Sequence, residues 1–139
     1  MTRYRAIGIV AAALSLSSIW GCGAKAPVDP LQAQAWEHGI EILGVEFLGG
    51  GDFVRLNYRV VDYGKAKRSL QGDISLVPEG ADRPLPVAST GRLGPLRQRP
   101  SSTGRPQFML FTNYERTLAK GGHATLKVGE SRIAGIPVS

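Results

Sequence analysis

The clearest pattern in the chain is a strict alternation of apolar and polar positions between residues 53 and 62. The apolar positions share one parity: Val54, Leu56, Tyr58 and Val60. The positions between them carry Arg or Asn. Because successive side chains of an extended strand point to opposite faces, this pattern predicts a β-strand with one face in the core and one in solvent.

The segment before it, residues 39–48, contains two alternating apolar pairs that are out of phase with each other. The pairs are Ile40 with Ile42 and Val45 with Phe47. One extra residue in a strand inverts the facing of everything after it, so the change of phase predicts a β-bulge at Gly44. Three glycines and an aspartate at residues 49–52 then predict a tight hairpin turn.

Shorter apolar stretches, separated by turn residues, predict further strands. They fall at residues 73–78, 85–88, 107–113, 123–128 and 132–138. The uninterrupted run Phe108-Met109-Leu110-Phe111 predicts a strand that is buried on both faces. Residues 63–71 are rich in basic side chains and predict one helical turn or a charged crossover. Between residues 89 and 106 the periodicity disappears, which predicts a long loop.

The fold class predicted by this arrangement is all-β. About seven strands, with turn residues at short intervals, favour an antiparallel β-sandwich, and an immunoglobulin-like arrangement is the first expectation. The paired cysteines and core Trp of antibody domains have no counterpart in this sequence, so the expectation concerns architecture alone. A small barrel is the alternative.

Length and composition exclude several classes of protein. A chain of 139 residues suits one domain, and its single Cys cannot form an intramolecular disulfide or a four-thiolate metal site. With 42% hydrophobic and 20% charged residues, the sequence is neither a disordered tail nor a multi-span membrane protein.

The N-terminus has the organisation of an export signal. Arg3 and Arg5 precede an uncharged, mostly apolar run at residues 6–20. A membrane-spanning helix needs about 20 apolar residues, so this run is short for a permanent span. A buried core helix would show an amphipathic stripe, which the run lacks. The segment therefore predicts an N-terminal signal helix that is removed by cleavage.

The run ends at Ile19-Trp20-Gly21-Cys22, and Cys22 is the single cysteine of the chain. This tetrapeptide resembles the lipobox of bacterial lipoproteins, although Trp20 is bulkier than the usual residue at its position. The resemblance implies cleavage before Cys22, a thioether-linked diacylglycerol on its sulfur, and acylation of the new amino group by a fatty acid such as palmitate. An ordinary secretory signal with an unmodified thiol is the alternative.

Three regions follow from this assignment. Residues 1–21 are the signal peptide, residues 22–38 are the lipidated Cys22 and a linker that can hold a short helix, and residues 39–139 are the β-sandwich domain. Two or three acyl chains hold a protein durably at a membrane without spanning it. Gly23 stands where an Asp would resemble an inner-membrane retention signal, which favours the outer membrane. The expected location is therefore the periplasmic face of that membrane.

Positive charge gathers in the predicted loop. No Asp or Glu occurs between Asp82 and Glu115, and four arginines lie within the loop: Arg92, Arg97, Arg99 and Arg105. The guanidinium group presents a planar fork of donors that suits carboxylates and phosphates. The four are therefore candidate contacts to an anionic polymer, a lipid headgroup or an envelope protein. The alternative is a solvated loop in which Arg97 pairs with a carboxylate at a strand edge.

The net charge of +6 does not by itself indicate nucleic acid as the partner. Removal of Arg3 and Arg5 with the signal leaves 15 basic and 11 acidic residues, a net charge of +4. Export separates the protein from nucleic acid, and the sequence lacks the interleaved aromatic and basic residues of single-strand binding surfaces. Nucleic acid is therefore not an expected partner.

No catalytic constellation is recognisable in the sequence. His38 and His123 lie 85 residues apart, and neither has a second His or a Cys nearby. The nucleophile elbow of hydrolases is missing, and a lipidated Cys22 has no free thiol. Glu41 and Glu46, the nearest approach to paired carboxylates, are expected on the solvated side of a strand. The sequence therefore predicts a protein that is not an enzyme, with no catalytic residue, cofactor or metal ligand.

Five short motifs of the chain are Trp36-Glu37 with Gly39-Ile40, Tyr58-Arg59-Val60-Val61-Asp62, Lys65-Ala66, Gly94-Pro95-Leu96-Arg97, and Phe108-Met109-Leu110-Phe111 with Asn113. Together they resemble uncharacterised exported proteins of proteobacteria. That resemblance brings no activity with it, and hence no catalytic residues. The expected function is a lipid-anchored, non-catalytic binding or accessory module of the cell envelope, with its ligand open. The alternatives are a small envelope enzyme or ligand carrier, and a purely structural component of an envelope assembly.

Overall fold

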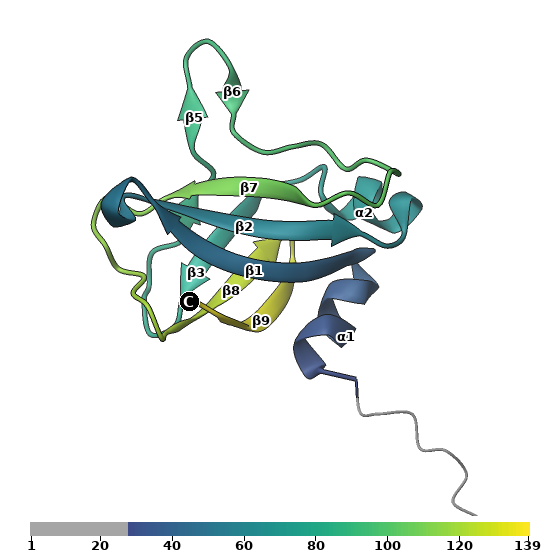
Figure 1. Cartoon of the computed structure of the whole chain (residues 1–139), viewed down its shortest axis with the longest axis horizontal. Helices are drawn as coiled ribbons and strands as arrows, with labels where there is room; N and C mark the ends of the chain where they lie inside the picture. The colour runs from purple at the N-terminus through teal and green to yellow at the C-terminus, as the bar shows by residue number, and fades with distance from the viewer. Residues whose placement is uncertain (1–27) are drawn as a thin grey trace, which may run out of the picture.

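The computed structural model describes residues 28–139, and antiparallel β-strands dominate this part of the chain (Figure 1). The strands of one sheet are β1 (Ile40–Leu48), β2 (Phe53–Val60) and β7 (Gln107–Thr112), in the order β1-β2-β7. Those of the second sheet are β3 (Ile74–Pro78), β4 (Leu85–Pro86), β8 (His123–Val128) and β9 (Ser131–Pro137), in the order β4-β3-β8-β9. A small third sheet pairs β5 (Ser89–Thr90) with β6 (Gly94–Pro95).

The order of the strands is that of an immunoglobulin-like sandwich. If the seven strands of the two main sheets are lettered A, B, C, C′, E, F and G along the chain, strands A, B and E form one sheet and C′, C, F and G the other. Neighbouring strands are antiparallel in both sheets. The predicted all-β, antiparallel β-sandwich is therefore confirmed.

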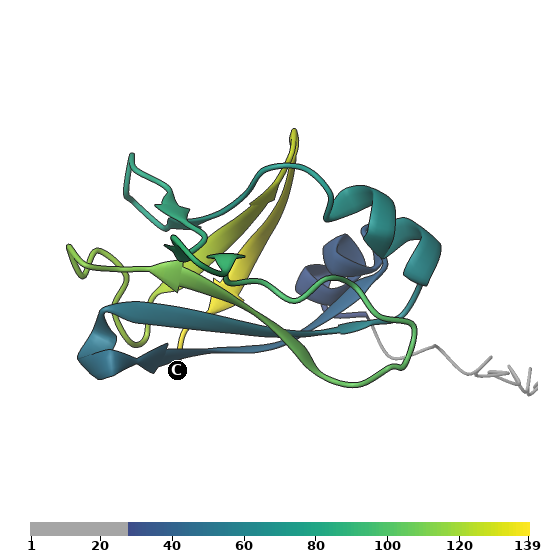
Figure 2. The same cartoon turned by 90° about the horizontal axis from the view of Figure 1, so that it is seen from above.

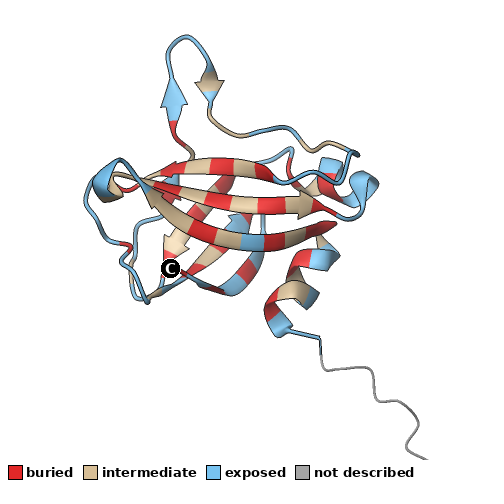
Figure 3. Cartoon of the chain, in the orientation of Figure 1, coloured by how far each residue is buried: buried red, intermediate tan, exposed pale blue. Residues whose placement is uncertain are grey.

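The core lies between the two main sheets, and alternate residues of β2, β3, β7 and β8 supply much of it (Figure 3). In β2, Val54, Leu56 and Tyr58 are fully buried, as their alternation predicts. Phe111 of β7 and Leu126 of β8 are fully buried as well. Burial of each large apolar side chain contributes about 2 kcal/mol to folding, so this shared interior is what holds the sheets together.

Two local predictions for β1 are confirmed. The register between β1 and β2 shifts between Ile42 and Gly44, which leaves Leu43 as the extra, exposed residue of a bulge. The two strands are joined through the 3₁₀ turn η1 (Gly49–Gly51), in which Gly50 has a left-handed φ of 68°. Glycine adopts that conformation without the steric cost that a side chain would bring.

Residues 89–106 are not the unpaired loop that the sequence predicts. β5 and β6 form a hairpin that projects from the sandwich (Figure 1), and the residues after it pair with β7. The Leu110 N–H donates to the carbonyl of Leu96 at 3.0 Å, and the Gln98 N–H donates to the carbonyl of Phe108 at 3.1 Å. Backbone pairing of this kind needs no alternation of apolar side chains, so the hydrophobic pattern does not reveal it.

The environment of β7 also differs from its prediction. Met109 and Phe111 are buried, but Phe108 and Leu110, which alternate with them, are only half-buried. The prediction of a strand buried on both faces was therefore wrong. One face of β7 packs in the core, whereas the other has no second sheet above it among the described residues.

The chain after β4 passes from one sheet to the other. β4 itself pairs with β3 of the second sheet, whereas Val87 forms a bridge with Phe111 of the first. The Ala88 N–H then donates to the carbonyl of Leu110 at 2.7 Å. Backbone hydrogen bonds thus connect the two main sheets at this side of the molecule.

Helix α1 (Pro30–Glu37) lies against the edge strands β1 and β9. The Gln32 side chain pairs with both backbone groups of Ile42 in β1: it donates to the carbonyl at 2.8 Å and accepts from the N–H at 3.0 Å. Gln34 accepts from the Ala134 N–H of β9 at 3.0 Å. Two glutamines of α1 therefore satisfy backbone groups at the free edges of both sheets.

Helix α2 (Tyr63–Ser69) packs beside the segment that links α1 to β1. Asp62 caps it, and its carboxylate accepts from the Lys65 N–H at 3.0 Å. Gly39, between α1 and β1, lies so close to α2 that a Cβ atom there would collide with the carbonyl oxygen of Asp62. Gly39 also has a left-handed φ of 74°, so glycine suits this position on both counts.

A cationic cleft as the candidate binding site

Two of the four arginines singled out from the sequence lie together, and two do not. Arg97 and Arg99 line one cleft. Arg92 lies in the exposed turn between β5 and β6, and Arg105 is exposed just before β7. Neither of the latter two lines the cleft. The structure therefore divides the predicted set, and the candidate site retains only Arg97 and Arg99.

The cleft has a volume of about 680 Å³ and lies between α2 and the chain that connects β6 to β7. α2 and the two residues after it form one wall, and residues 93–100 form the other. Ile74 at the start of β3 and Met109 of β7 lie between these walls. A volume of this size is in the range of pockets that take small molecules.

Backbone pairing with β7 positions the segment that carries the two arginines. Arg97 forms a bridge with Met109, and its Nη1 donates to the Gly72 carbonyl at 3.2 Å. The guanidinium group of Arg97 thus binds a backbone carbonyl, whereas the alternative interpretation of the loop expects a carboxylate at a strand edge. A neutral carbonyl does not cancel the charge of the guanidinium group, so Arg97 keeps the cleft positive.

Tyr58 supports the same segment from the core. Its hydroxyl donates to the carbonyl of Gln98 at 2.9 Å, although the two residues are 40 positions apart. Burial raises the pKa of Tyr58 to about 12, against the opposing effect of the Arg97 charge. The hydroxyl therefore stays protonated at neutral pH and remains a hydrogen-bond donor.

The buried side chain of Gln107 holds the segment at its other end. Its Nε2 donates to the Arg99 carbonyl at 2.6 Å, and its Oε1 accepts from the Ser101 N–H at 2.9 Å. Gln107 was not a candidate from the sequence. A signal was present, because Gln107 shares the parity of Met109 and Phe111, and a polar residue on a buried parity needs hydrogen-bond partners.

Three side chains give the cleft its charge: Lys67, Arg97 and Arg99. None of the described residues that line it is acidic. Lys67 was not a candidate from the sequence, because only the fold brings α2 against residues 93–100. The floor is apolar and includes the buried side chains of Leu70 and Met109. Cationic donors beside an apolar floor suit an anion that also carries an apolar group.

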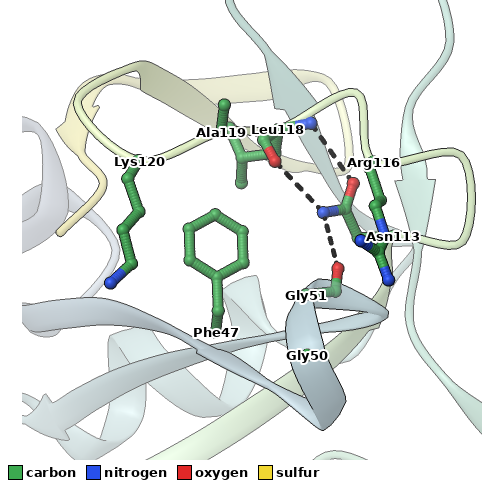
Figure 4. A pocket seen from close by; sticks show the side chains of 8 residues that line it. All are labelled: Phe47, Gly50, Gly51, Asn113, Arg116, Leu118, Ala119 and Lys120. Carbon is green, nitrogen blue, oxygen red and sulfur yellow. Dashed lines mark hydrogen bonds between the residues drawn. The ribbon is translucent and has the colours of Figure 1, made fainter.

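A second pocket, of about 450 Å³, lies between the β1–β2 turn and the chain that connects β7 to β8. Figure 4 shows the Phe47 ring in the middle of this pocket, with Lys120 on one side and Arg116 on the other. Arg116 pairs with Asp52 at 3.5 Å. Because that carboxylate offsets one of the two cations, this pocket is a weaker candidate for an anion than the cleft.

Asn113 forms one wall of the second pocket and has a structural role (Figure 4). The side chain is fully buried. Its Nδ2 donates to the carbonyls of Gly51 and Leu118, at 2.9 and 3.2 Å, and its Oδ1 accepts from the Leu118 N–H at 3.2 Å. The amide thus ties the β7–β8 connection to the turn at η1.

The two histidines do not line the cleft, and they make separate local contacts. His38 Nδ1 lies 3.1 Å from Ser69 Oγ, and His123 Nδ1 lies 3.5 Å from the Glu79 carboxylate. Within residues 28–139, no group of three or more His, Cys, Asp or Glu side chains is arranged to hold a metal ion.

Glu41 and Glu46 lie on the outer side of β1, where each pairs with an arginine of β2. Glu41 pairs with Arg59, and Glu46 pairs with Arg55. The Glu46 carboxylate also accepts from the Asn57 side chain at 2.8 Å. Hydrogen bonds from Asn57 and Arg55 hold the pKa of Glu46 below its ordinary value. Both carboxylates thus form cross-strand ion pairs.

The candidate lipid-attachment residue, Cys22, and the predicted signal peptide lie outside the described residues. Within residues 28–139, neither helix is long and apolar enough to cross a membrane. Comparisons with protein-family models, curated proteins and solved structures found no match to the chain. Fold and site therefore define the protein by class: an immunoglobulin-like β-sandwich with a cationic cleft at one end.

Proposed function

We propose that this protein is a lipid-anchored, non-catalytic binding module of the cell envelope, and that the cleft is its site for an anionic ligand. The observation that carries the proposal is the convergence of Lys67, Arg97 and Arg99 on one cleft with an apolar floor. The lipobox-like sequence at Cys22 supports membrane attachment, and Gly23 supports the periplasmic face of the outer membrane.

Three cations are enough to give a measurable affinity. Lys67 and Arg99 are exposed and Arg97 is half-buried, so each contact to an anion is worth at most about 1 kcal/mol, the upper end of the range for solvated ion pairs. Loss of all three contacts then weakens binding by up to about 3 kcal/mol, at most about 100-fold. Because the charges are near solvent, the effect falls as salt is added.

A ligand carrier is the second candidate function. The observation in its favour is the cleft volume of about 680 Å³, which would enclose much of a small molecule. A purely structural envelope component makes the opposite prediction, because its function would survive neutralisation of all three cleft cations.

The anchor is tested in cells by Cys22→Ala. The variant should lose incorporation of labelled palmitate and keep the higher mass of the uncleaved precursor, because the acceptor sulfur and the cleavage site are both removed. Ser18→Ala, a change of similar size in the same segment, is the control and should keep both the labelling and the mass of the processed protein. Unchanged palmitate labelling of Cys22→Ala would reject the anchor.

The cleft is tested with two triple variants of the full chain, purified in non-ionic detergent and eluted from heparin resin by a salt gradient. The first neutralises the cleft: Lys67→Gln, Arg97→Gln and Arg99→Gln. The second removes the same three charges elsewhere: Lys127→Gln, Arg92→Gln and Arg105→Gln. The cleft triple should elute at clearly lower salt than the control triple, whose net charge is identical. Coincident elution of the two would reject the cleft as the binding site.

A further inference from the structure

α1 and α2 meet at one end of the sandwich, as both views of the fold show (Figures 1 and 2). Gly39 lies at the junction: its N–H donates to the Trp36 carbonyl at 3.0 Å, and its carbonyl accepts from the Val61 N–H at 2.9 Å. The side chains of His38 and Ser69 approach to 3.1 Å and link the same two helices. The residues around this junction therefore form one packed unit.

Three large apolar or aromatic side chains are exposed at the junction, and we name them the junction patch: Trp36, Val61 and Tyr63. Their exposed fractions are 45%, 51% and 44%. Trp and Tyr combine an apolar body with a polar end, and they are enriched where proteins meet the interface between a membrane and water.

Positive charge adjoins the junction patch on the side of α2 and the cleft. The basic residues of α2 and of the adjoining cleft wall are Lys65, Lys67, Arg68, Arg97 and Arg99. Two acidic residues adjoin the patch in the chain: Glu37 follows Trp36, and Asp62 lies between Val61 and Tyr63. Tyr63 belongs to both features, because it lies in the patch and also lines the cleft. Exposed aromatic side chains next to a basic cleft match the chemistry of an anionic membrane surface.

The length of chain before α1 limits how far this end can be from a membrane. Seven residues, 23–29, separate Cys22 from Pro30 at the start of α1. Fully extended, seven residues reach about 25 Å. The nine-residue strand β1, which leads away from the junction, is itself about 30 Å long. A lipid on Cys22 would therefore hold the start of α1, which leads into the junction, within about 25 Å of the bilayer.

From the junction patch, the basic residues beside it and the short segment between Cys22 and α1, we infer that the α1–α2 end rests on the membrane. We further infer that the cleft binds the headgroup of an anionic phospholipid of that membrane. The inference rests on the proposed function, and it names the ligand class. The phosphate lies against Lys67, Arg97 and Arg99, and the glycerol and the first methylenes of the acyl chains cover the apolar floor. The junction patch inserts at headgroup depth beside it.

The test uses Trp36 as a reporter in the full, membrane-attached chain. The sequence has two Trp residues, so Trp20→Phe leaves Trp36 as the single tryptophan whether or not the signal is cleaved, and excitation near the red edge of the absorption band selects it over tyrosine. The protein is reconstituted into vesicles of phosphatidylcholine, or of phosphatidylcholine mixed with phosphatidylglycerol. In the mixed vesicles the Trp36 emission should shift to shorter wavelength, brominated lipid chains should quench it, and aqueous iodide should lose access.

The cleft and control triples separate the parts of the inference. With the cleft triple the emission shift should be lost, and with the control triple it should persist. A shift of equal size in the cleft triple would reject the headgroup assignment, and equal iodide access in both kinds of vesicle would reject the membrane contact. If the cleft binds heparin but Trp36 stays exposed to iodide, the membrane contact is rejected and the proposed anion site stands. If the cleft and control triples elute from heparin at the same salt, both the anion site and the headgroup assignment are rejected.

Discussion

The hydroxyl of Tyr58, a fully buried residue in the middle strand of one sheet, donates to the carbonyl of Gln98 in the wall of the cleft. Gln98 lies between Arg97 and Arg99, so this one hydrogen bond connects the core to both arginines of the candidate site. The position of the cationic side chains therefore depends on the packing of β2.

Replacement of Tyr58 by Phe should lower the free energy of unfolding by about 1 kcal/mol, because the Gln98 carbonyl loses its donor while the ring stays in place. Urea unfolding followed by circular dichroism measures the change. Heparin retention should fall as well, because the arginine segment is held less firmly. Tyr114→Phe, at an exposed ring that packs edge-on against Phe53, is the control and should change stability by less than about 0.5 kcal/mol.

Tyr58 also predicts how stability changes in alkali. An unfolded tyrosine loses its proton near pH 10, whereas burial raises the pKa of Tyr58 to about 12 in the folded protein. Between these values the unfolded state binds fewer protons than the folded state, so the free energy of unfolding falls as the pH rises. The contribution is complete below pH 10 and is lost through pH 12. In Tyr58→Phe this part of the slope should vanish, and an unchanged slope would contradict the assignment.

The lowered pKa of Glu46 predicts how the free energy of unfolding changes in acid. Hydrogen bonds from Asn57 and Arg55 lower its pKa, so on acidification the unfolded state takes up this proton first. The stabilisation is present above the ordinary value of 4.5 and is lost as the pH falls below it. Glu46→Gln should therefore lose less stability than the wild type between pH 7 and pH 3. Glu130→Gln, in the exposed β8–β9 turn, should keep the wild-type difference in urea midpoint.

Truncation of Asn113 should be among the more destabilising changes in the protein. Asn113→Ala removes three hydrogen bonds in a fully buried setting and strands two backbone groups of Leu118, at a cost of about 3 kcal/mol. Thermal and urea unfolding measure the loss. Thr112→Ala, at the half-buried residue before Asn113, is the control and should cost less than about 1 kcal/mol. Equal losses in the two variants would show that the hydrogen bonds of the Asn113 amide do not add to stability.

The edge of β1 should open when the Gln32 amide is replaced. Gln32→Glu keeps an acceptor for the Ile42 N–H but loses the donor to the Ile42 carbonyl and places a carboxylate against it. Hydrogen exchange at the Ile42 amide should accelerate about fivefold, the equivalent of about 1 kcal/mol. Ala33→Glu adds a carboxylate at an exposed position of the same helix and should leave that amide unchanged.

The sequence predicts the long strands well because the alternation of apolar and polar residues shows which side chains point into the core. The parity of Val54, Leu56 and Tyr58 and the change of phase at Gly44 are properties of residue order, and the structure confirms both. The pairing of residues 96–98 with β7 left no such trace, since it rests on backbone groups that every residue carries.

The candidate site is predictable only in part for a related reason. Charge counting found Arg97 and Arg99, but it could not separate them from Arg92 and Arg105, because all four occupy the same stretch of polar sequence. Lys67 joins the cleft through the packing of α2 against a segment about 30 positions away, and no local pattern encodes that approach. The buried parity of Gln107 was the one unused signal.

The crossing at Val87 has a consequence for the shape of the whole sandwich. Followed through backbone hydrogen bonds, the strands run β9, β8, β3, β4 and then, by way of Ala88, β7, β2 and β1. The described strands thus form one continuous hydrogen-bonded series that folds over at Val87. Its two edge strands, β9 and β1, lie next to each other. α1 lies against both edge strands and occupies backbone groups of each. One short helix therefore hinders the pairing of either edge with a strand from a neighbouring molecule.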